Sequence, residues 1–350
     1  MKFQNGGINT HDIARSTDGL TLFAPLRHDK GYLINMEGEV VHHWELNKGG
    51  VNRCRLTDSG NLLIAEMSEG GPPLYAGKGG RIREYDWDSK LIWEHHDDNQ
   101  HHDARRLPNG NTLYIAWDAF DEITAKRVQG GLPGTEKDGV IYGDSIREVT
   151  SEGELVWEWG TREMEIEKYP ICPLCPRAEF AHANTCSPLQ NGDVLISFRV
   201  LNLLIIVDRK TRKIKWEKQD LTFGHQHDCH YLDNGNILVF CNGFHGRDVD
   251  MASSVREFNP KNDEIVCEFK ANPFTSFYSA NISGAQRLWS GNTLICEGNR
   301  GCLFEVTPEG EIVWEFVNPY FSPHPAFGTT NWIFRAYRYP TNAPQLQGRF

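Results

Sequence analysis

The sequence predicts an all-β protein, a six-bladed β-propeller with four-stranded antiparallel blades and two long inserted loops. Two interleaved repeats and the near absence of helical periodicity lead to this prediction. In the first repeat an apolar strand ends in Trp-Glu. The Trp of each copy is Trp44, Trp93, Trp157, Trp216 or Trp314, and a degenerate copy has Cys267 in its place.

The second repeat is a strand, a tight turn that contains glycine, and another strand. It reads "RLPNGNTLYIAW", "LQNGDVLISFR", "LDNGNILVFCNG" and "LWSGNTLICEG", with looser copies nearer the N-terminus. Its turn glycines are Gly19, Gly60, Gly110, Gly192, Gly235 and Gly291. The two repeats together supply four strands per unit. One such unit cannot bury both of its faces, so units are stabilised by stacking around an axis.

Two units carry extra chain, at about 118–143 and 161–181. Both segments are rich in Gly and Pro and are too long for hairpin turns, so we expect lids over one face or structural clasps. The segment 331–339 is expected to be a last strand that closes the ring by pairing with the N-terminal blade. We therefore expect a single propeller domain over 1–350.

Composition narrows the classes of partner. The formal net charge of −11 disfavours a nucleic-acid partner, because phosphate binding requires a basic face. No apolar run is long enough to cross a bilayer, so no membrane partner is expected. The first residues lack the apolar core of a secretion signal, and the nine cysteines are scattered through strand-like segments. We expect a cytoplasmic protein with reduced, mostly buried thiols and a small-molecule partner.

The repeat also predicts which side chains face the central channel, because the first strand of each blade lines the axis. The position eight residues before each turn glycine is polar in every unit: His11, Asn52, His102, Asn184, His227 and Ser283. Further polar residues stand close to these positions: His101, His182, Arg199, Gln226 and Asn242. We expect these residues to supply the catalytic and substrate-binding groups.

Several imidazoles in one cavity are costly to bury unless an anion or a metal compensates them. We therefore expect His102, His182 and His227 to form a ligand site, whereas His11 is more simply a turn residue. Asp103 and Asp228 directly follow two of these histidines. Each could orient an imidazole or serve the backbone and packing instead, since adjacent strand residues face opposite ways.

Four phrases, "AHANTCSPLQNGDVLISFR", "GHQHDCHYLDNGNILVFCNG", "GGLPGTEKDGVIYGD" and "FRAYRYP", resemble the arylsulfotransferase-like propellers over most of the chain. Members of that family transfer a sulfuryl group from a phenolic sulfate to a phenolic acceptor, without a nucleotide donor, through a sulfohistidine. The resemblance implies that His227 is the nucleophile and that His182, Asn184 and Arg199 bind the sulfuryl oxygens. It further implies an aromatic or anionic substrate and no cofactor.

The chemistry of this assignment is coherent. A neutral imidazole can attack sulfur and divide one difficult transfer into two easier steps. The planar guanidinium of Arg199 suits the oxygens on which charge gathers. His102 or His182 can supply the proton that the departing phenolate needs, and His101 is close enough in sequence to take the place of His102.

Two other functions remain open. The first is a metal-dependent lyase or hydrolase, with a divalent ion on His102, His182 and His227. The wider set of donors for such an ion is His101, His102, His182, His225, Gln226, His227 and His230. The second is a non-catalytic propeller whose channel binds an anionic ligand or whose rim binds a protein.

Cys172 and Cys175 form the one C-x-x-C of the sequence, which is half of a zinc site. The surrounding loop offers no further ligand, although folding could bring Cys186 or a histidine close. A simple loop turn, a structural metal site and a disulfide are therefore all open. The nearby "GGLPGTEKDG" lacks the Lys-Ser/Thr of a phosphate-binding loop, and we expect a lid there.

Overall fold

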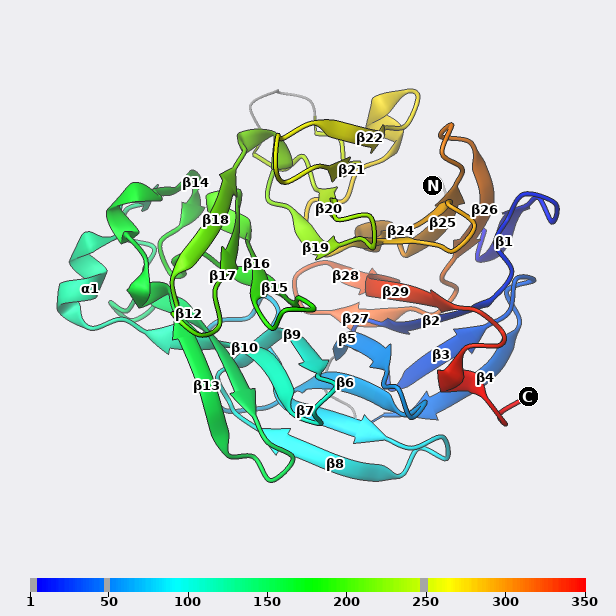
Figure 1. The fold of residues 1–350 in the computed structure, drawn as a ribbon, viewed down its shortest axis with the longest axis horizontal. Coiled ribbons are helices and arrows are strands. Elements are labelled where there is room, and N and C mark those ends of the chain that lie inside the picture. Colours follow the sequence, from blue (N-terminus) through cyan, green and yellow to red (C-terminus); the bar gives the residue numbers. More distant parts are fainter. Residues whose placement is uncertain (1–4, 47–50, 246–250) are drawn as a thin grey trace.

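The structure, a computed structural model, describes residues 5–46, 51–245 and 251–350. Six antiparallel sheets stand around a central axis, which confirms the predicted six-bladed propeller (Figure 1). The innermost strands of neighbouring blades contact one another in a closed ring. No helix in this described part of the chain is both long and apolar enough to span a bilayer.

Each blade runs outward from an inner strand. The first blades are β29 (Ile333–Tyr339), β2 (Leu20–Pro25), β3 (Lys30–Ile34), β4 (Val40–Glu45); β5 (Val51–Leu56), β6 (Leu62–Met67), β7 (Gly80–Tyr85), β8 (Leu91–His96); and β9 (Gln100–Arg106), β10 (Thr112–Ala119), β12 (Tyr142–Val149), β13 (Leu155–Gly160). The others are β15 (Ala183–Pro188), β16 (Val194–Phe198), β17 (Leu203–Val207), β18 (Ile214–Gln219); β19 (His227–Tyr231), β20 (Ile237–Cys241), β21 (Ser254–Phe258), β22 (Ile265–Phe269); and β23 (Gly284–Arg287), β24 (Thr293–Glu297), β25 (Cys302–Val306), β26 (Ile312–Val317), β1 (Gly7–His11).

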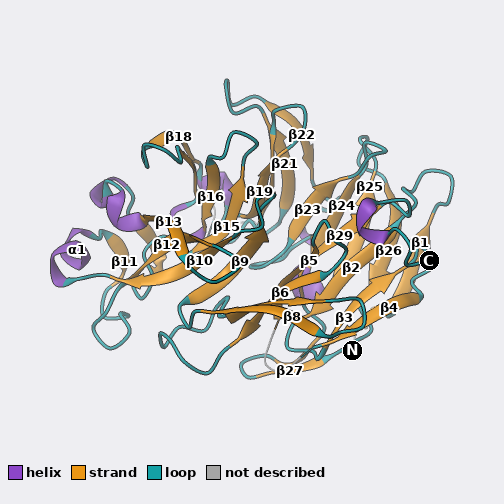
Figure 2. Cartoon of the chain, turned by 60° about the horizontal axis from the view of Figure 1, so that its bottom comes forward, coloured by secondary structure: helices purple, strands orange, loops and turns teal. Residues whose placement is uncertain are grey.

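The remaining elements are short. They are α1 (Glu122–Arg127), the small strands β11 (Gly130–Leu132), β14 (Ile171–Pro176), β27 (Ser322–His324) and β28 (Gly328–Thr330), and the 3₁₀ turns Thr161–Glu163, Ile166–Lys168, Arg199–Leu201, Leu221–Phe223, Phe274–Ser276, Gly298–Arg300 and Pro344–Leu346. Figure 2 shows how little of the chain is helical.

Both ends of the chain close the ring. The C-terminal strand β29 pairs with β2 and is the inner strand of the first blade, while β1 pairs with β26 at the outer edge of the last blade. The placement of His11 on an inner strand is therefore wrong, because His11 lies opposite Trp314 in this outermost strand. The prediction from the turn glycines assumed that each repeat supplies its own inner strand. In the first blade, however, the inner strand is β29 from the C-terminus.

The Trp-Glu repeat has a physical role between blades. The Trp314 indole N–H donates a hydrogen bond of 2.8 Å to the carbonyl oxygen of Met36 in the next blade. The same bond joins the other Trp copies to the following blade: Trp44 to Asp86, Trp93 to Ser151, Trp157 to Arg209 and Trp216 to Pro260. Cys267 in the degenerate copy has no indole to donate such a bond. The repeat thus marks where one blade is fastened to the next.

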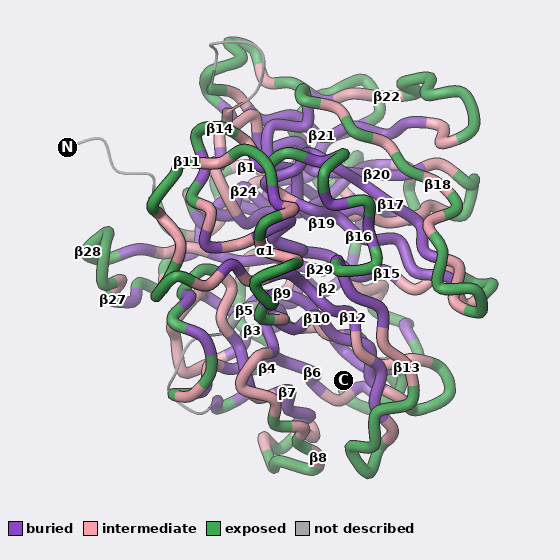
Figure 3. The backbone as a smooth tube through the Cα atoms, turned by 90° about the vertical axis from the view of Figure 1, so that its left-hand side faces the viewer, coloured by how far each residue is buried: buried purple, intermediate pink, exposed green. Residues whose placement is uncertain are grey.

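The core lies within the inner strands and between the blades. Residues of β16, β17 and β20 are buried throughout, whereas the outer strands β8 and β18 alternate between partly buried and exposed residues (Figure 3). The two insertions meet where β11 pairs with β14 in parallel, in a lobe that includes α1 at the edge of the ring (Figure 1). All nine cysteines are unpaired, and most are buried.

Candidate functional site

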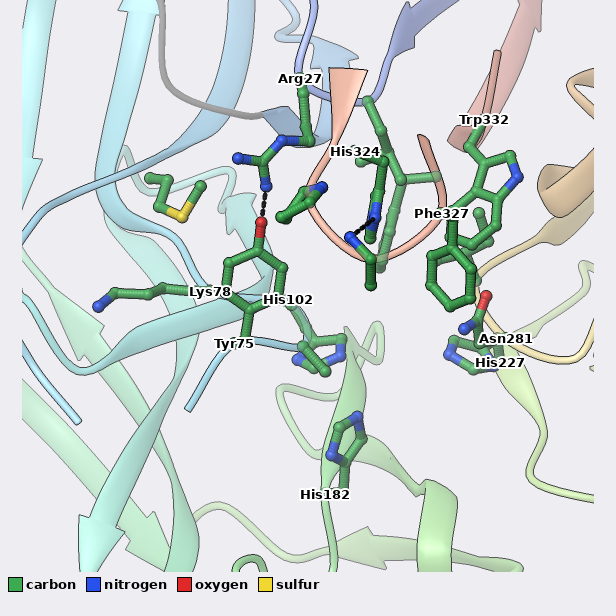
Figure 4. A pocket seen from close by; sticks show the side chains of 18 of the residues that line it. Arg27, Tyr75, Lys78, His102, His182, His227, Asn281, His324, Phe327 and Trp332 are labelled. Carbon is green, nitrogen blue, oxygen red and sulfur yellow. Dashed lines mark hydrogen bonds between the residues drawn. The ribbon is translucent and has the colours of Figure 1, made fainter. Parts of the chain in front are cut away.

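A cavity of about 550 Å³ opens on one face of the ring, and four of the expected residues line it. They are His102, His182, Arg199 and His227, which come from three different blades. Figure 4 shows the three histidines around the cavity. The structure therefore brings together residues more than a hundred positions apart in the chain. Among the described residues, none from the insertions 118–143 and 161–181 lines this cavity, so the insertions do not act as its lid here.

The His227 imidazole is held by the Asn242 amide. Asn242 Nδ2 donates to the backbone oxygens of Ser279 (2.8 Å) and Ile282 (3.1 Å), so Oδ1 is the atom that faces His227 Nδ1, at 2.8 Å. An amide oxygen only accepts, and therefore Nδ1 of His227 must carry the proton. Nε2 keeps the lone pair. Burial, and then the charge of Arg199, hold the pKa of His227 well below its usual value.

The His182 imidazole is oriented by a carboxylate. Its Nδ1 lies 3.0 Å from Glu179 Oε2, while Glu179 Oε1 accepts a bond of 2.8 Å from the Trp117 indole. Burial opposes ionisation of Glu179, but His182 and His101 outweigh it and lower the pKa of this carboxyl. A charged Glu179 places the proton of His182 on Nδ1 and leaves Nε2 for the cavity.

The His102 imidazole is supported from behind by His101. Their Nδ1 atoms are 2.7 Å apart, so one donates and the other accepts. His101 stacks on Trp117, and its Nε2 lies 3.2 Å from a carboxylate oxygen of Asp144. Burial and the neighbouring rings of His182 and His101 hold the pKa of His102 well below its usual value, so this imidazole is neutral at pH 7.

Close packing also fixes His102 from its other side. The His102 backbone N–H donates to the Gly77 carbonyl oxygen (2.7 Å), and a Cβ at Gly77 would lie 2.0 Å from the His102 ring. Gly77 also has a φ of +71°, which favours glycine. The rings of His102 and His182 meet edge to face with centroids 4.7 Å apart.

Backbone bulges explain why the histidines reach the cavity. The pairing register shifts between Tyr114 and Ile115 opposite β9, between Ala183 and Thr185 in β15, and between His227 and His230 in β19. His102, His182 and Asp228 have φ values of 52°, 53° and 51° at or beside these shifts. A bulge turns a side chain away from strict alternation, and bulges are frequent at binding sites.

The aspartates of the two His-Asp pairs point to a different place. Asp103 pairs with Arg53 and accepts from the Cys186 backbone N–H at 3.0 Å, and Asp228 lies 3.2 Å from Arg335 Nη1. Burial alone would raise the pKa of Asp228, but Arg335 and neighbouring cations lower it to about 2. These aspartates form ion pairs with arginines inside the ring, and so they do not orient the neighbouring histidines.

Several predicted site residues lie outside the cavity lining. The side-chain amides of Asn184 and Gln226 are buried and donate hydrogen bonds to backbone carbonyl oxygens. Asn184 donates to Gln226 (2.7 Å), and Gln226 donates to Phe198 and Leu203. Ser283 is buried and donates to the Ser279 hydroxyl at 2.8 Å. These three residues hold the inner strands that carry the histidines.

The remaining candidates lie elsewhere. Asn52 belongs to β5, but its side chain falls outside the described residues. His230 is half-buried beside Asp228 in a second cavity, and loss of solvent around its ring lowers its pKa to about 4. His225 contacts Cys175, with Sγ and Nε2 3.9 Å apart, instead of the main cavity.

Sequence reasoning missed the aromatic rim of the cavity. Tyr75, His324, Phe327, Trp332 and Phe334 line it, and Figure 4 shows His324, Phe327 and Trp332 across from the three channel histidines. His324, Phe327 and Trp332 form a cluster with ring centroids 4.8 to 5.2 Å apart. The hairpin β27–β28 carries part of this rim. The one available signal was an aromatic-rich insertion between the last Trp-Glu and the closing strand.

Comparison with solved structures supports the propeller fold. No curated protein matches the chain. A protein of unknown function from Bacteroides caccae has a solved structure that is 18% identical, with a TM-score of 0.59 over 92% of this chain and 99% of that chain. A streptogramin B lyase structure is 10% identical, with a TM-score of 0.53 over 95% of this chain and 93% of that one. At such identities these structures share the fold alone.

The family comparison is more specific than these structural neighbours. The family model for arylsulfotransferase (ASST) matches residues 74–319, which include the strands of four blades together with His102, His182, Arg199 and His227. Because this match spans well over half of the sequence, the chain belongs to the arylsulfotransferase family.

Proposed function

We propose that this protein transfers a sulfuryl group from an aryl sulfate to a phenolic acceptor, with His227 as the nucleophile. The observation that carries the proposal is the hydrogen bond from His227 Nδ1 to Asn242 Oδ1 (2.8 Å). Since Asn242 cannot turn without losing two backbone bonds, His227 is held as the tautomer whose Nε2 has a free lone pair. His227 thereby has the form that a nucleophile requires.

In the first step His227 Nε2 attacks sulfur, an N–S bond forms and the S–O bond to the aryl group breaks. The electron pair of that bond leaves with the phenolate, which takes a proton from the cationic form of His182, whose charge is paired with Glu179. In the second step the acceptor phenol gives its proton to the same base and its oxygen attacks sulfur. The N–S bond then breaks and its electron pair returns to Nε2. Neither step needs a cofactor.

Arg199 and the rim supply binding. Arg199 lines the cavity and begins the 3₁₀ turn after β16, where its backbone N–H donates to the His182 carbonyl at 3.1 Å. Its guanidinium can pair with sulfuryl oxygens as their charge grows. The aromatic rim of Phe327 and Trp332 suits the flat ring of an aryl sulfate. The negative charge of an anionic aromatic substrate therefore suits Arg199, and its ring suits the aromatic rim.

The spacing of the channel histidines favours this function over a metal-dependent one. In the described ranges, one set of three or more His, Cys, Asp or Glu residues has its ligand atoms within 4.8 Å of one another, and His102, His182 and His227 are not in that set. A lyase or hydrolase that holds its ion on these three histidines would need them to move closer together.

The test is to trap the intermediate. Mixed with a chromogenic aryl sulfate, the protein should release phenolate and gain the mass of one SO₃ group, which a phenolic acceptor then removes. His227→Ala should lose both signals, while the control His43→Ala, in the outer strand β4, should keep them. A mass gain that persists in His227→Ala would refute the assignment. So would a divalent ion that His102→Ala and His227→Ala both lose and that activity requires.

A further inference from the structure

A second cluster of chemistry-bearing side chains lies beside the cavity and plays no part in the proposed reaction. Cys172 and Cys175 come from β14 in the second insertion, His225 precedes β19, and His245 follows β20. One donor atom from each of these four residues lies within 4.8 Å of every other. Three segments far apart in the sequence thus meet at one point, with two thiols and two imidazoles.

The spacing of the donors fits a tetrahedral zinc ion. With Zn–S of about 2.3 Å and Zn–N of about 2.0 Å, ligand atoms at the corners of a tetrahedron are roughly 3.3–3.8 Å apart. Cys172 Sγ and His245 Nδ1 are 3.6 Å apart, Cys175 Sγ and His245 Nδ1 are 3.8 Å apart, and Cys175 Sγ and His225 Nε2 are 3.9 Å apart. These separations are close to the edges of such a tetrahedron.

Burial points to a ligand as well. Cys175 is 3% exposed and His225 is fully buried, and neither cysteine forms a disulfide. Thiolates and imidazoles together are the donor set that selects zinc among the common divalent ions.

The backbone is shaped to bring the two histidines together. The Phe244 N–H donates to the Gly224 carbonyl at 2.9 Å, and a Cβ on Gly224 would lie 2.4 Å from the Cα of Gly243. Both glycines have positive φ, 57° and 72°. The His225 N–H donates to the Asn202 side-chain oxygen at 2.7 Å. Close approach of these two turns is therefore built into the fold.

We propose that Cys172, Cys175, His225 and His245 bind one structural zinc ion. Four protein ligands leave no open coordination position, which is the mark of a structural site rather than a catalytic one. The ion would fasten the second insertion to the two segments that carry His227 and Asn242, because each segment holds a ligand within three residues of one of them. This proposal is independent of the sulfuryl-transfer proposal.

The first test is metal content. The full chain, produced without a histidine tag and passed through a desalting column, should contain one zinc ion per chain by plasma mass spectrometry. Cys172→Ser, Cys175→Ser and His225→Ala should each lower this by tenfold or more. The matched controls Cys267→Ser and His43→Ala should keep the full content, since Cys267 is a partly exposed thiol in β22.

The second test does not depend on the folding of any variant. Wild-type protein exchanged with cobalt should show the visible absorption of a tetrahedral cobalt–thiolate site, and zinc should abolish it. Removing zinc by a chelator should lower the melting temperature by at least about 5 °C, and added zinc should restore it. A zinc-free wild type that takes up neither metal overturns the proposal, as does a Cys172–Cys175 disulfide found by mass spectrometry. Full metal content in Cys175→Ser would overturn it too.

Discussion

Replacing Asn242 by leucine tests how the structure prepares His227. The change keeps the size of the side chain but removes the oxygen that accepts from His227 Nδ1. Removing one partner of a buried hydrogen bond, so that the other is left unpaired, costs about 1–3 kcal/mol of free energy. At about 1.4 kcal/mol per tenfold, the transfer rate should fall roughly 5- to 150-fold. The imidazole should also redistribute its proton between Nδ1 and Nε2.

Two readouts separate positioning from structural damage. Transfer rates at saturating aryl sulfate report the loss of activity, and ¹⁵N NMR of labelled histidine reports which nitrogen of His227 carries the proton. The control is Gln286→Leu, which removes a half-buried amide that bonds the Arg338 backbone away from the histidines. If Asn242→Leu keeps both the wild-type rate and the Nδ1–H tautomer, the reasoning from the amide to the nucleophile fails.

Two further predictions concern stability. Trp314→Phe leaves the Met36 carbonyl without its indole donor, so the free energy of unfolding measured in urea titrations should fall by about 1 kcal/mol. The control Trp289→Phe, at a half-exposed position, should change it little. Equal effects of the two changes would contradict a role for the Trp repeat between blades. Burial raises the pKa of Glu297 to about 7, so the folded protein binds a proton there that the unfolded chain releases at lower pH. The stability it contributes is full below about pH 4.5 and is lost as pH rises through about 7, by at most about 3 kcal/mol. Glu297→Gln should flatten this decline between pH 5 and 8, and an unchanged pH slope would rule out Glu297 as its source.

The sequence was sufficient to predict the blades. The Trp-Glu strands and the glycine turns repeat because each blade must solve the same packing problem, so the pattern is local and visible. The same periodicity singled out His102 and His227, and the polar residues near its positions added His182 and Arg199; the structure does place these four around one cavity. It could not separate these residues from Asn184 and Ser283, which have equivalent positions but face the backbone.

Only the tertiary structure decided which of these polar side chains face the cavity, because this depends on backbone bulges that no local sequence pattern reveals. A bulge of a single residue reverses which side chain faces the axis, and such bulges occur between Ala183 and Thr185 and between His227 and His230. In β9 two residues, His102 and Asp103, bulge together. The sequence by itself determined that several histidines would share the centre of a propeller. Only the folded ring decided which amide holds His227, that His11 lies on an outer edge, and that Cys175 meets His225 and His245 across three separate segments.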